Sequence, residues 1–188
     1  MATTIKHISQ FLDRRGWLYQ ANKDANTIRT RVEASQLENL VIVIELTENG
    51  EYLSLRTSPL VQVKDHVYKG VLFQTLLTIA SESKLLRWEY EPTTGDIRAS
   101  VGLALEDATL TEKQFNRLLN GLIYLVDDVS LPRIKSVLAT GEDKGDRSAA
   151  IQVISMVERF IAKPLDKEAK ASLEQAIAQQ CCSLISKP

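Results

Sequence analysis

The sequence predicts an α+β fold in which an antiparallel β-sheet packs against helices. Two hairpins support this prediction. One turns at Asn49-Gly50 after a continuous apolar run at residues 40–44, and the other turns near Gly95 between strands whose apolar residues alternate. The second hairpin leads into a helix that Thr111 and Gln114 are spaced to begin with a capping box. Strands and helices that alternate in this way are expected to enclose one shared core.

Each element is predicted by its hydrophobic period and its flanking residues. The helix over residues 65–83 is apolar on nearly all sides, which indicates burial on more than one side. The expected elements are, in order, a helix from Thr4 to about Arg15, strands at 17–19, 27–34, 40–44 and 52–57, the helix at 65–83, strands at 86–90 and 97–105, a helix from Thr111 with Leu110 and Phe115 as its hydrophobic staple, and a short helix that starts at Asp127-Asp128, has Pro132 in its first turn and ends before Gly141.

The chain divides into a core and a tail. Residues 1–140 form the α+β core, and residues 141–148 are rich in glycine and charge, which is typical of a linker. Two amphipathic patterns separated by Pro164 predict a C-terminal helical hairpin over residues 149–188, which packs on the core or on a partner.

The composition favours an ordinary globular protein. Hydrophobic residues make up 44% and charged residues 25%, and the net charge of −1 gives no electrostatic footprint for nucleic acid. No apolar run is long enough to span a bilayer, and the first residues lack a signal-peptide pattern. The only cysteines, Cys181 and Cys182, are adjacent and are expected to be inert. We therefore expect a cytoplasmic protein without membrane or nucleic-acid partners.

The residues that could do chemistry lack the spacing that chemistry needs. His7 and His66 have no further ligand at metal-binding spacing, and the acidic residues at 142–146 lack the order of a calcium loop. Asp127 and Asp128 point in different directions on a helix and are better explained by capping. No phosphate loop or nucleophile elbow is present in the sequence. We predict no catalytic residues, no metal site and no cofactor, and hence no enzyme.

One face of the predicted sheet has the composition of a binding surface. Its centre is apolar and its fringe is rich in arginine, with Arg98 joining from the second hairpin, and arginine and aromatic residues are enriched at protein interfaces. The alternative is that the tail helices cover this face. The candidate partner-binding residues are Arg29, Arg31, Val41, Val43, Tyr52 and Arg56.

The helix at 65–83 is the candidate for contact between two copies of the chain. A two-fold interface uses one self-complementary patch, which an all-round apolar helix can supply. The candidate dimer contacts are Val67, Val71, Leu72 and Leu76.

The second hairpin and the helix after it carry a family resemblance. Residues 84–90, the turn at Gly95, residues 97–107 and the helix start at Leu110 resemble the YbjN family, whose fold is similar to that of type III secretion chaperones. The resemblance covers residues 3–140 and leaves the tail unmatched. It implies an antiparallel sheet packed on helices, no catalytic residues, frequent dimerisation, and a chaperone-like or regulatory role in holding extended segments of partner proteins.

The leading functional hypothesis is a non-enzymatic, chaperone-like or regulatory module that binds a protein or peptide partner, with homodimer formation. One alternative is a small-molecule sensor or enzyme with a pocket between tail and core. Another is a structural subunit of a larger assembly in which the tail makes the contact.

Overall fold

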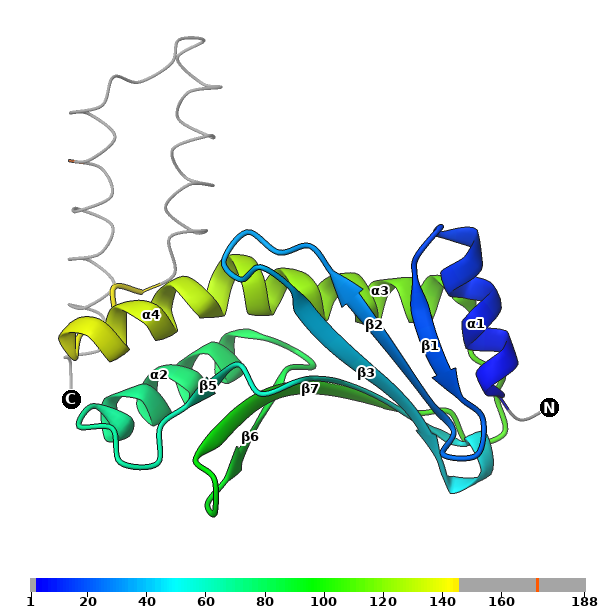
Figure 1. The fold of residues 1–188 in the computed structure, drawn as a ribbon, viewed down its shortest axis with the longest axis horizontal. Coiled ribbons are helices and arrows are strands. Elements are labelled where there is room, and N and C mark those ends of the chain that lie inside the picture. The colour runs from blue at the N-terminus through cyan, green and yellow to red at the C-terminus, as the bar shows by residue number, and fades with distance from the viewer. Residues whose placement is uncertain (1–2, 146–171, 173–188) are drawn as a thin grey trace, which may run out of the picture.

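The computed structural model describes residues 3–145 and Ser172, which form a sheet with helices on one of its faces and at one end (Figure 1). The predicted α+β fold, with an antiparallel sheet packed against helices, is confirmed. The predicted helical tail, residues 149–188, lies outside the described residues apart from Ser172. The elements are α1 (Ile5–Arg14), β1 (Tyr19–Asn22), β2 (Thr27–Val32), β3 (Leu40–Thr47), β4 (Tyr52–Thr57), β5 (Val61–Gln62), α2 (Lys69–Glu82), β6 (Arg87–Glu91), β7 (Asp96–Ala104), α3 (Glu112–Tyr124), a π-helical turn (Leu125–Ser130) and α4 (Leu131–Thr140).

The seven strands form one sheet in the order β1-β2-β3-β4-β7-β5, and β6 also pairs with β7. Every pairing is antiparallel. The long strand β7 organises one end of the sheet, because β6 runs along it while β4 and β5 pair with its end and its start. Strand β3 lies between β2 and β4.

Both predicted hairpin turns are present and depend on glycine. Gly50 has a φ of +92°, and a Cβ there would lie 2.2 Å from the carbonyl oxygen of Thr3. Gly95 has a φ of +81°, and its Cβ would lie 2.3 Å from the backbone nitrogen of Lys64. Any side chain would therefore clash as well as strain the backbone at these two positions.

The core lies between the sheet and the helices α1 and α3. Alternate residues of β2, β3, β4 and β7 point into it, as the period of two predicts. A second cluster of buried residues joins α2 and α4 to the start of β7. The central cluster includes Ile8, Leu12, Ile28, Ile42, Ile44, Leu53, Leu55, Val101, Phe115 and Leu119.

The start of α3 is built as predicted. The Thr111 side chain accepts from the backbone N–H of Gln114, and the Gln114 side chain accepts from the backbone N–H of Thr111. Leu110 and Phe115, the predicted staple, are both buried. The helix α1 begins with the same arrangement, in which the Nδ1 of His7 accepts from the backbone N–H of Thr4 at 3.3 Å. His7 thus has a structural role at a helix start.

The strand predicted at residues 17–19 is displaced, since β1 begins at Tyr19 and continues to Asn22. The reason lies in the end of α1. There the backbone N–H of Trp17 donates to the carbonyl oxygen of Leu12 at 3.1 Å, and Gly16 turns the chain with a φ of +68°. Trp17 therefore terminates the helix and is not free to pair in the sheet.

The role predicted for Asp127 and Asp128 at the start of a new helix is wrong. The chain stays helical from α3 through the π-helical turn into α4. The buried carboxylate of Asp127 instead accepts from the backbone N–H groups of Ser35 and Gln36, at 2.6 and 2.8 Å. It anchors the loop between β2 and β3 to the helical layer.

Among residues 3–145, no helix has the length and apolar character needed to cross a membrane.

Candidate partner-binding surface

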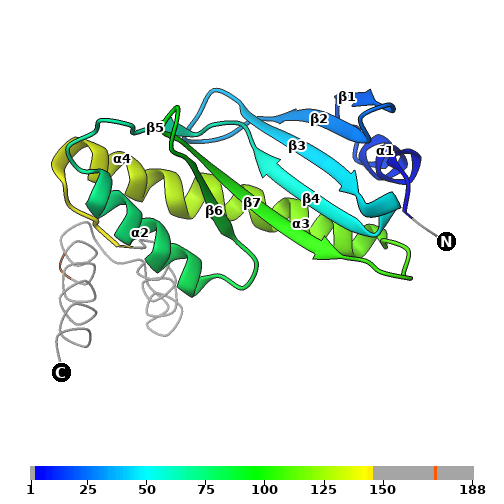
Figure 2. The same cartoon turned by 90° about the horizontal axis from the view of Figure 1, so that it is seen from below.

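The six predicted partner-binding residues lie on the sheet face that points away from α1 and α3. Figure 2 looks onto this face, with α3 behind the strands, and α2 lies beside the sheet near β6. The described helices leave the face uncovered (Figure 1). We call it the open face and define it by Leu18, Arg29, Arg31, Val41, Val43, Glu45, Tyr52, Ser54, Arg56, Arg87 and Arg98.

Strand register places these side chains in rows across the sheet. Arg29 is opposite Val43, and Val43 is opposite Arg56, so one valine stands between two arginines. Arg31 is opposite Val41 in the neighbouring row. Directly opposed residues are close enough for their side chains to touch. The predicted residues of β2, β3 and β4 therefore form one continuous surface.

The exposure of these residues suits contact with a partner. Arg29 and Arg31 are exposed, while Val41 and Val43 are half-buried between their neighbours. Their valine methyl groups thus stay accessible, although the arginine stems on either side can shield part of them. This mixture of an accessible apolar centre and a cationic fringe is what the sequence predicted.

Tyr52 lies on the open face at the start of β4. A Cβ at Gly102 would lie 2.1 Å from the Tyr52 hydroxyl oxygen, so the ring extends over this glycine on β7. Gly102 gives the ring room to lie along the sheet. Tyr52 therefore adds a broad, half-buried surface next to the row of Arg56.

Leu18 belongs to the open face and was missed by the sequence analysis. Trp17 and Tyr19 pack against the core, so Leu18 between them points to the other side of the sheet. It is 89% exposed, more than any other large hydrophobic residue described. Extending the register that pairs Tyr19 with Thr30 by one residue places Leu18 opposite Arg31. The alternation of residues 17–19 could have revealed it.

Ion pairs are distributed unevenly over the face. Arg56 contacts Glu45 at 3.3 Å, Arg98 contacts Asp96 at 3.5 Å, and Arg87 contacts Glu89 at 3.3 Å. Arg29 and Arg31 have no carboxylate within 4.0 Å among residues 3–145. The two free cations therefore both lie on β2.

The candidate dimer contacts on α2 are only partly at the surface. Leu72 and Leu76 are 0% and 4% exposed, because they pack against β7 and α4 of the same chain, so their assignment to a dimer contact is wrong. Val71 on α2 is half-buried, and Val67, which lies in the turn before α2 and not in the helix predicted from residue 65, is 83% exposed. Leu77, which we did not select, is 71% exposed on the same helix.

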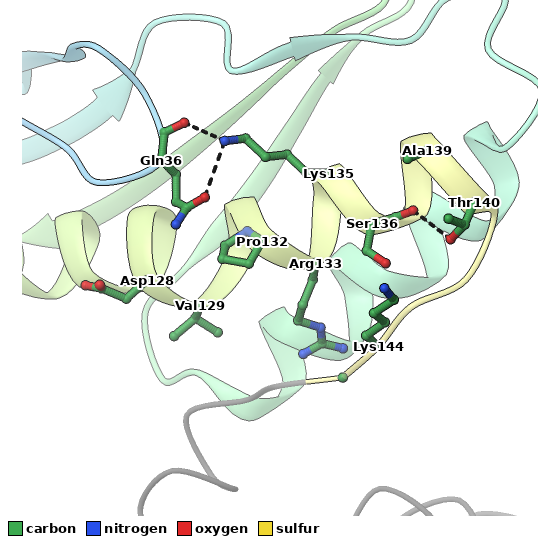
Figure 3. Close-up of a pocket in the computed structure, with 11 residues that line it drawn as sticks. Gln36, Asp128, Val129, Pro132, Arg133, Lys135, Ser136, Ala139, Thr140 and Lys144 are labelled. Carbon is green, nitrogen blue, oxygen red and sulfur yellow. Dashed lines mark hydrogen bonds between the residues drawn. The ribbon is translucent and has the colours of Figure 1, made fainter. Parts of the chain in front are cut away.

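A cavity of about 530 Å³ lies along α4 (Figure 3). Its described lining comes from α4, the π-helical turn, Gln36 and residues 144–145. The Nζ of Lys135 donates to the carbonyl oxygen of Gln36 at 2.6 Å, and the Oγ of Ser136 donates to the carbonyl oxygen of Glu142 at 3.0 Å. Gln36 and Lys135 lie on one side of α4 and Arg133 on the other (Figure 3). These polar groups do not converge on a common point, as a small-molecule site requires.

Arg133, on the lining of this cavity, ties three segments together. Its buried guanidinium donates through Nε and Nη2 to the two carboxylate oxygens of Asp143, at 3.0 and 2.6 Å, and through Nη1 to Glu82 on α2 at 3.3 Å. Burial alone would raise the pKa of Asp143, but hydrogen bonds from Arg133 and from the backbone N–H of Gly145 hold that pKa below its ordinary value. We call this group the Arg133 clamp. The predicted linker is thus anchored to α4 as far as Gly145.

Among the residues described, no three His, Cys, Asp or Glu side chains are grouped so that they could hold a metal ion.

No protein-family model and no curated protein matches the chain. Solved structures with a similar arrangement include YbjN from E. coli, with 10% identity and a TM-score of 0.49 over 70% of this chain and 89% of that one. A chain of the ExsC–ExsE complex has 18% identity and a TM-score of 0.46, covering 63% and 84%. A chain of the HopA1–SchA chaperone–effector complex has 15% identity and a TM-score of 0.44, covering 62% and 85%. Likeness at this level concerns the fold alone, and membership of the YbjN family stays a prediction.

Proposed function

We propose that this chain is a non-enzymatic protein-binding module that holds a segment of a partner protein on its open face. The observation that carries the proposal is the position of Val41 and Val43 on that face. They are apolar, lie at the middle of a rigid sheet, and are covered by no described helix. Arg29 and Arg31 on β2 lie opposite Val43 and Val41, and Arg56 on β4 lies on the other side of Val43. Such a surface offers a partner apolar contact and charged hydrogen bonds at the same place.

The sheet supports this role by holding the side chains in fixed positions. Val41 and Val43 alternate with the fully buried Ile42 and Ile44, so the backbone that carries them is fixed by the core. A surface held in this way loses little conformational entropy when a partner binds. The edge of β1 that pairs with no described strand offers a second mode, in which a partner strand extends the sheet. That strand has only four residues, so the face supplies the larger contact.

We further propose that the protein is cytoplasmic and forms a homodimer. The contact is then restricted to Val71 and Leu77 on α2 and to Val67 just before this helix, in place of the buried leucines. Light scattering should give the mass of a dimer for the full chain and of a monomer for Leu77→Glu. A monomeric mass for the unaltered chain at micromolar concentration would contradict this part of the proposal.

Site-specific photo-crosslinking tests the binding function directly. A photoreactive phenylalanine analogue is placed at Val43 on the open face or, as a control, at the exposed Arg117 on α3. Both full-length variants are irradiated in the native cell, and adducts are identified by mass spectrometry. We expect a discrete adduct from position 43 that is absent from position 117. Equal adducts at both positions, or none at position 43, would contradict binding at the open face.

Paired substitutions distinguish a loss of contact with the partner from a loss of folding. Val41→Glu with Val43→Glu should abolish capture of the partner, because carboxylates replace the apolar contact. Val41→Thr with Val43→Thr is the matched control, since it keeps the β-branched shape that favours strands. Thermal unfolding is measured for both variants. Unfolding of the glutamate variant would show that the face is core in the working protein.

A further inference from the structure

The open face differs in charge between its two ends. At the end formed by β6 and β7, Arg87 and Arg98 are each paired with a carboxylate of the same chain. At the β2 end, Arg29 and Arg31 are exposed and lack such a partner among residues 3–145. A guanidinium that is not engaged within the fold remains available to bind a carboxylate of another molecule.

The same end of the face also carries its most accessible apolar groups. Leu18, the most exposed of the large hydrophobic residues described, directly precedes β1, and extending the β1–β2 register by one residue places it opposite Arg31. Val41 lies on the other side of that arginine. Arg29 has Val43 on one side and the polar Gln20 on the other. Cations and apolar side chains therefore alternate from strand to strand. We call these five residues, Leu18, Arg29, Arg31, Val41 and Val43, the arginine patch.

We propose that the arginine patch binds partner segments in which apolar side chains alternate with carboxylates. This proposal rests on the function proposed above and specifies the chemistry of the partner. The apolar side chains would contact Leu18 and the two valines, while the carboxylates accept hydrogen bonds from the guanidinium groups. Arginine suits this task because its planar fork can hold both oxygens of one carboxylate. Pairing of this kind selects among partners more strongly than it adds affinity.

The acidic residues near the arginine patch determine whether Arg29 or Arg31 is the stronger anchor for a carboxylate of the partner. Glu33, which is exposed and only two residues after Arg31 in the chain, partly offsets the charge of that arginine. Arg29 is four residues from Glu33, a separation of about 13 Å along a strand. Glu45, in the next row, is already held by Arg56. Arg29 is therefore the stronger anchor for a partner carboxylate.

The test uses the full-length chain and three short fluorescent peptides with the same apolar residues. Leucine alternates with glutamate in the first peptide, with glutamine in the second and with lysine in the third. Fluorescence anisotropy measures binding at low and at high sodium chloride concentration. We expect the glutamate peptide to bind about tenfold more tightly than the glutamine peptide, since each of the two exposed arginines adds a modest attraction to a carboxylate. This advantage should shrink at high salt, because salt screens exposed charges.

Substitutions then assign the effect to the patch. Arg29→Gln should reduce the preference for the glutamate peptide more than Arg31→Gln, and Arg87→Gln at the other end of the face should leave it unchanged. Arg29→Glu with Arg31→Glu should reverse the preference in favour of the lysine peptide. A reversal of this kind is a gain of binding, which a misfolded variant could not produce.

The outcomes separate this proposal from the one it rests on. Equal binding of the glutamate and glutamine peptides, weakened by Val41→Glu with Val43→Glu, would overturn the partner chemistry and leave the open face as a binding surface. Absence of binding by all three peptides would overturn both proposals. Preference for a single-stranded oligonucleotide over the glutamate peptide would also overturn the proposed chemistry, because it would assign the arginines to phosphate.

Discussion

The two faces of β3 give neighbouring residues of the same chemical class opposite environments. Ile42 and Ile44 are 0% exposed beneath the helical layer, whereas Val41 and Val43 on the other face remain half-exposed. All four are β-branched and aliphatic, so strand propensity alone does not distinguish them. The difference comes from the helices that cover one side only. Burial on this strand is therefore decided by contacts distant in sequence.

The helices that cover one face are fixed by polar contacts at their ends. The capping box at Thr111 satisfies the start of α3, the Asp127 carboxylate joins the helical layer to the loop after β2, and the Arg133 clamp joins α4 to α2. The open face has ion pairs between side chains but no comparable attachment to a second layer among the described elements. Five predictions, two of them on the Arg133 clamp, follow this difference from the covered face to the open one.

The largest effect on stability is expected when side chains on the two faces of β3 are shortened to alanine. Ile42→Ala should lower the free energy of unfolding by about 3 kcal/mol, because it leaves a cavity in the core. Val43→Ala, one residue away, should lower it by less than about 1 kcal/mol, since the site is partly solvated. Urea unfolding of the full chain measures both values. A similar loss for the two variants would mean that the open face is buried in solution by another part of the protein or by a second copy.

The next effect concerns the Arg133 clamp. Asp143→Ala should lower the free energy of unfolding by about 2 kcal/mol, because it leaves the buried guanidinium of Arg133 with Glu82 as its remaining partner. Glu142→Ala is the matched control, since only its backbone is engaged with α4. Equal losses for these two neighbours would show that the clamp contributes nothing specific.

The same clamp makes a prediction about pH. The pKa of Asp143 in the fold is below its ordinary value of 3.8, owing to the hydrogen bonds from Arg133 and Gly145 that outweigh burial. Its stabilising contribution is therefore complete above that ordinary value and is lost as the pH falls through the lower value in the folded state. The stability difference between the unaltered chain and Asp143→Asn should shrink on acidification below pH 3.8 and stay constant near neutral pH.

The third effect concerns the cap of α3. Thr111→Ala removes the hydroxyl oxygen that accepts a hydrogen bond from the backbone N–H of Gln114. It should lower the free energy of unfolding by about 1 kcal/mol. Thr111→Ser keeps the hydroxyl oxygen and should restore most of this stability. Lys113→Ala, an exposed change in the same turn, serves as the control. If serine and alanine behaved alike at position 111, the capping bond would not be the cause.

The parts of the fold that local patterns encode could be predicted from the sequence. Gly95 and the pair Asn49-Gly50 turn the chain because few other residues adopt such backbone angles, and Thr111 with Gln114 begins a helix by contacts three residues apart. The open face could be predicted too, because alternation along β2, β3 and β4 separates Arg29 and its neighbours from the core.

The contacts that the sequence did not reveal join distant segments. Asp127 binds a loop about ninety residues earlier in the chain, and nothing local distinguishes this role from that of a helix cap. Leu72 and Leu76 were assigned to a dimer contact because an all-round apolar helix does not show which of its sides another element covers. Likewise, the unequal charge of the open face depends on which arginine has a carboxylate within reach.

The smallest effect on stability is expected at the arginine patch, and it bears most directly on function. Arg29→Gln and Arg31→Gln should each change the free energy of unfolding by less than about 0.5 kcal/mol, because neither side chain is buried or paired within residues 3–145. Arg56→Gln, which breaks the contact with Glu45, should cost slightly more. A clear loss of stability for Arg29→Gln would assign that residue to the fold and withdraw it from partner binding. If stability is unchanged while discrimination between acidic and neutral peptides is lost, the two exposed arginines serve recognition, and the faces of the sheet divide folding from binding.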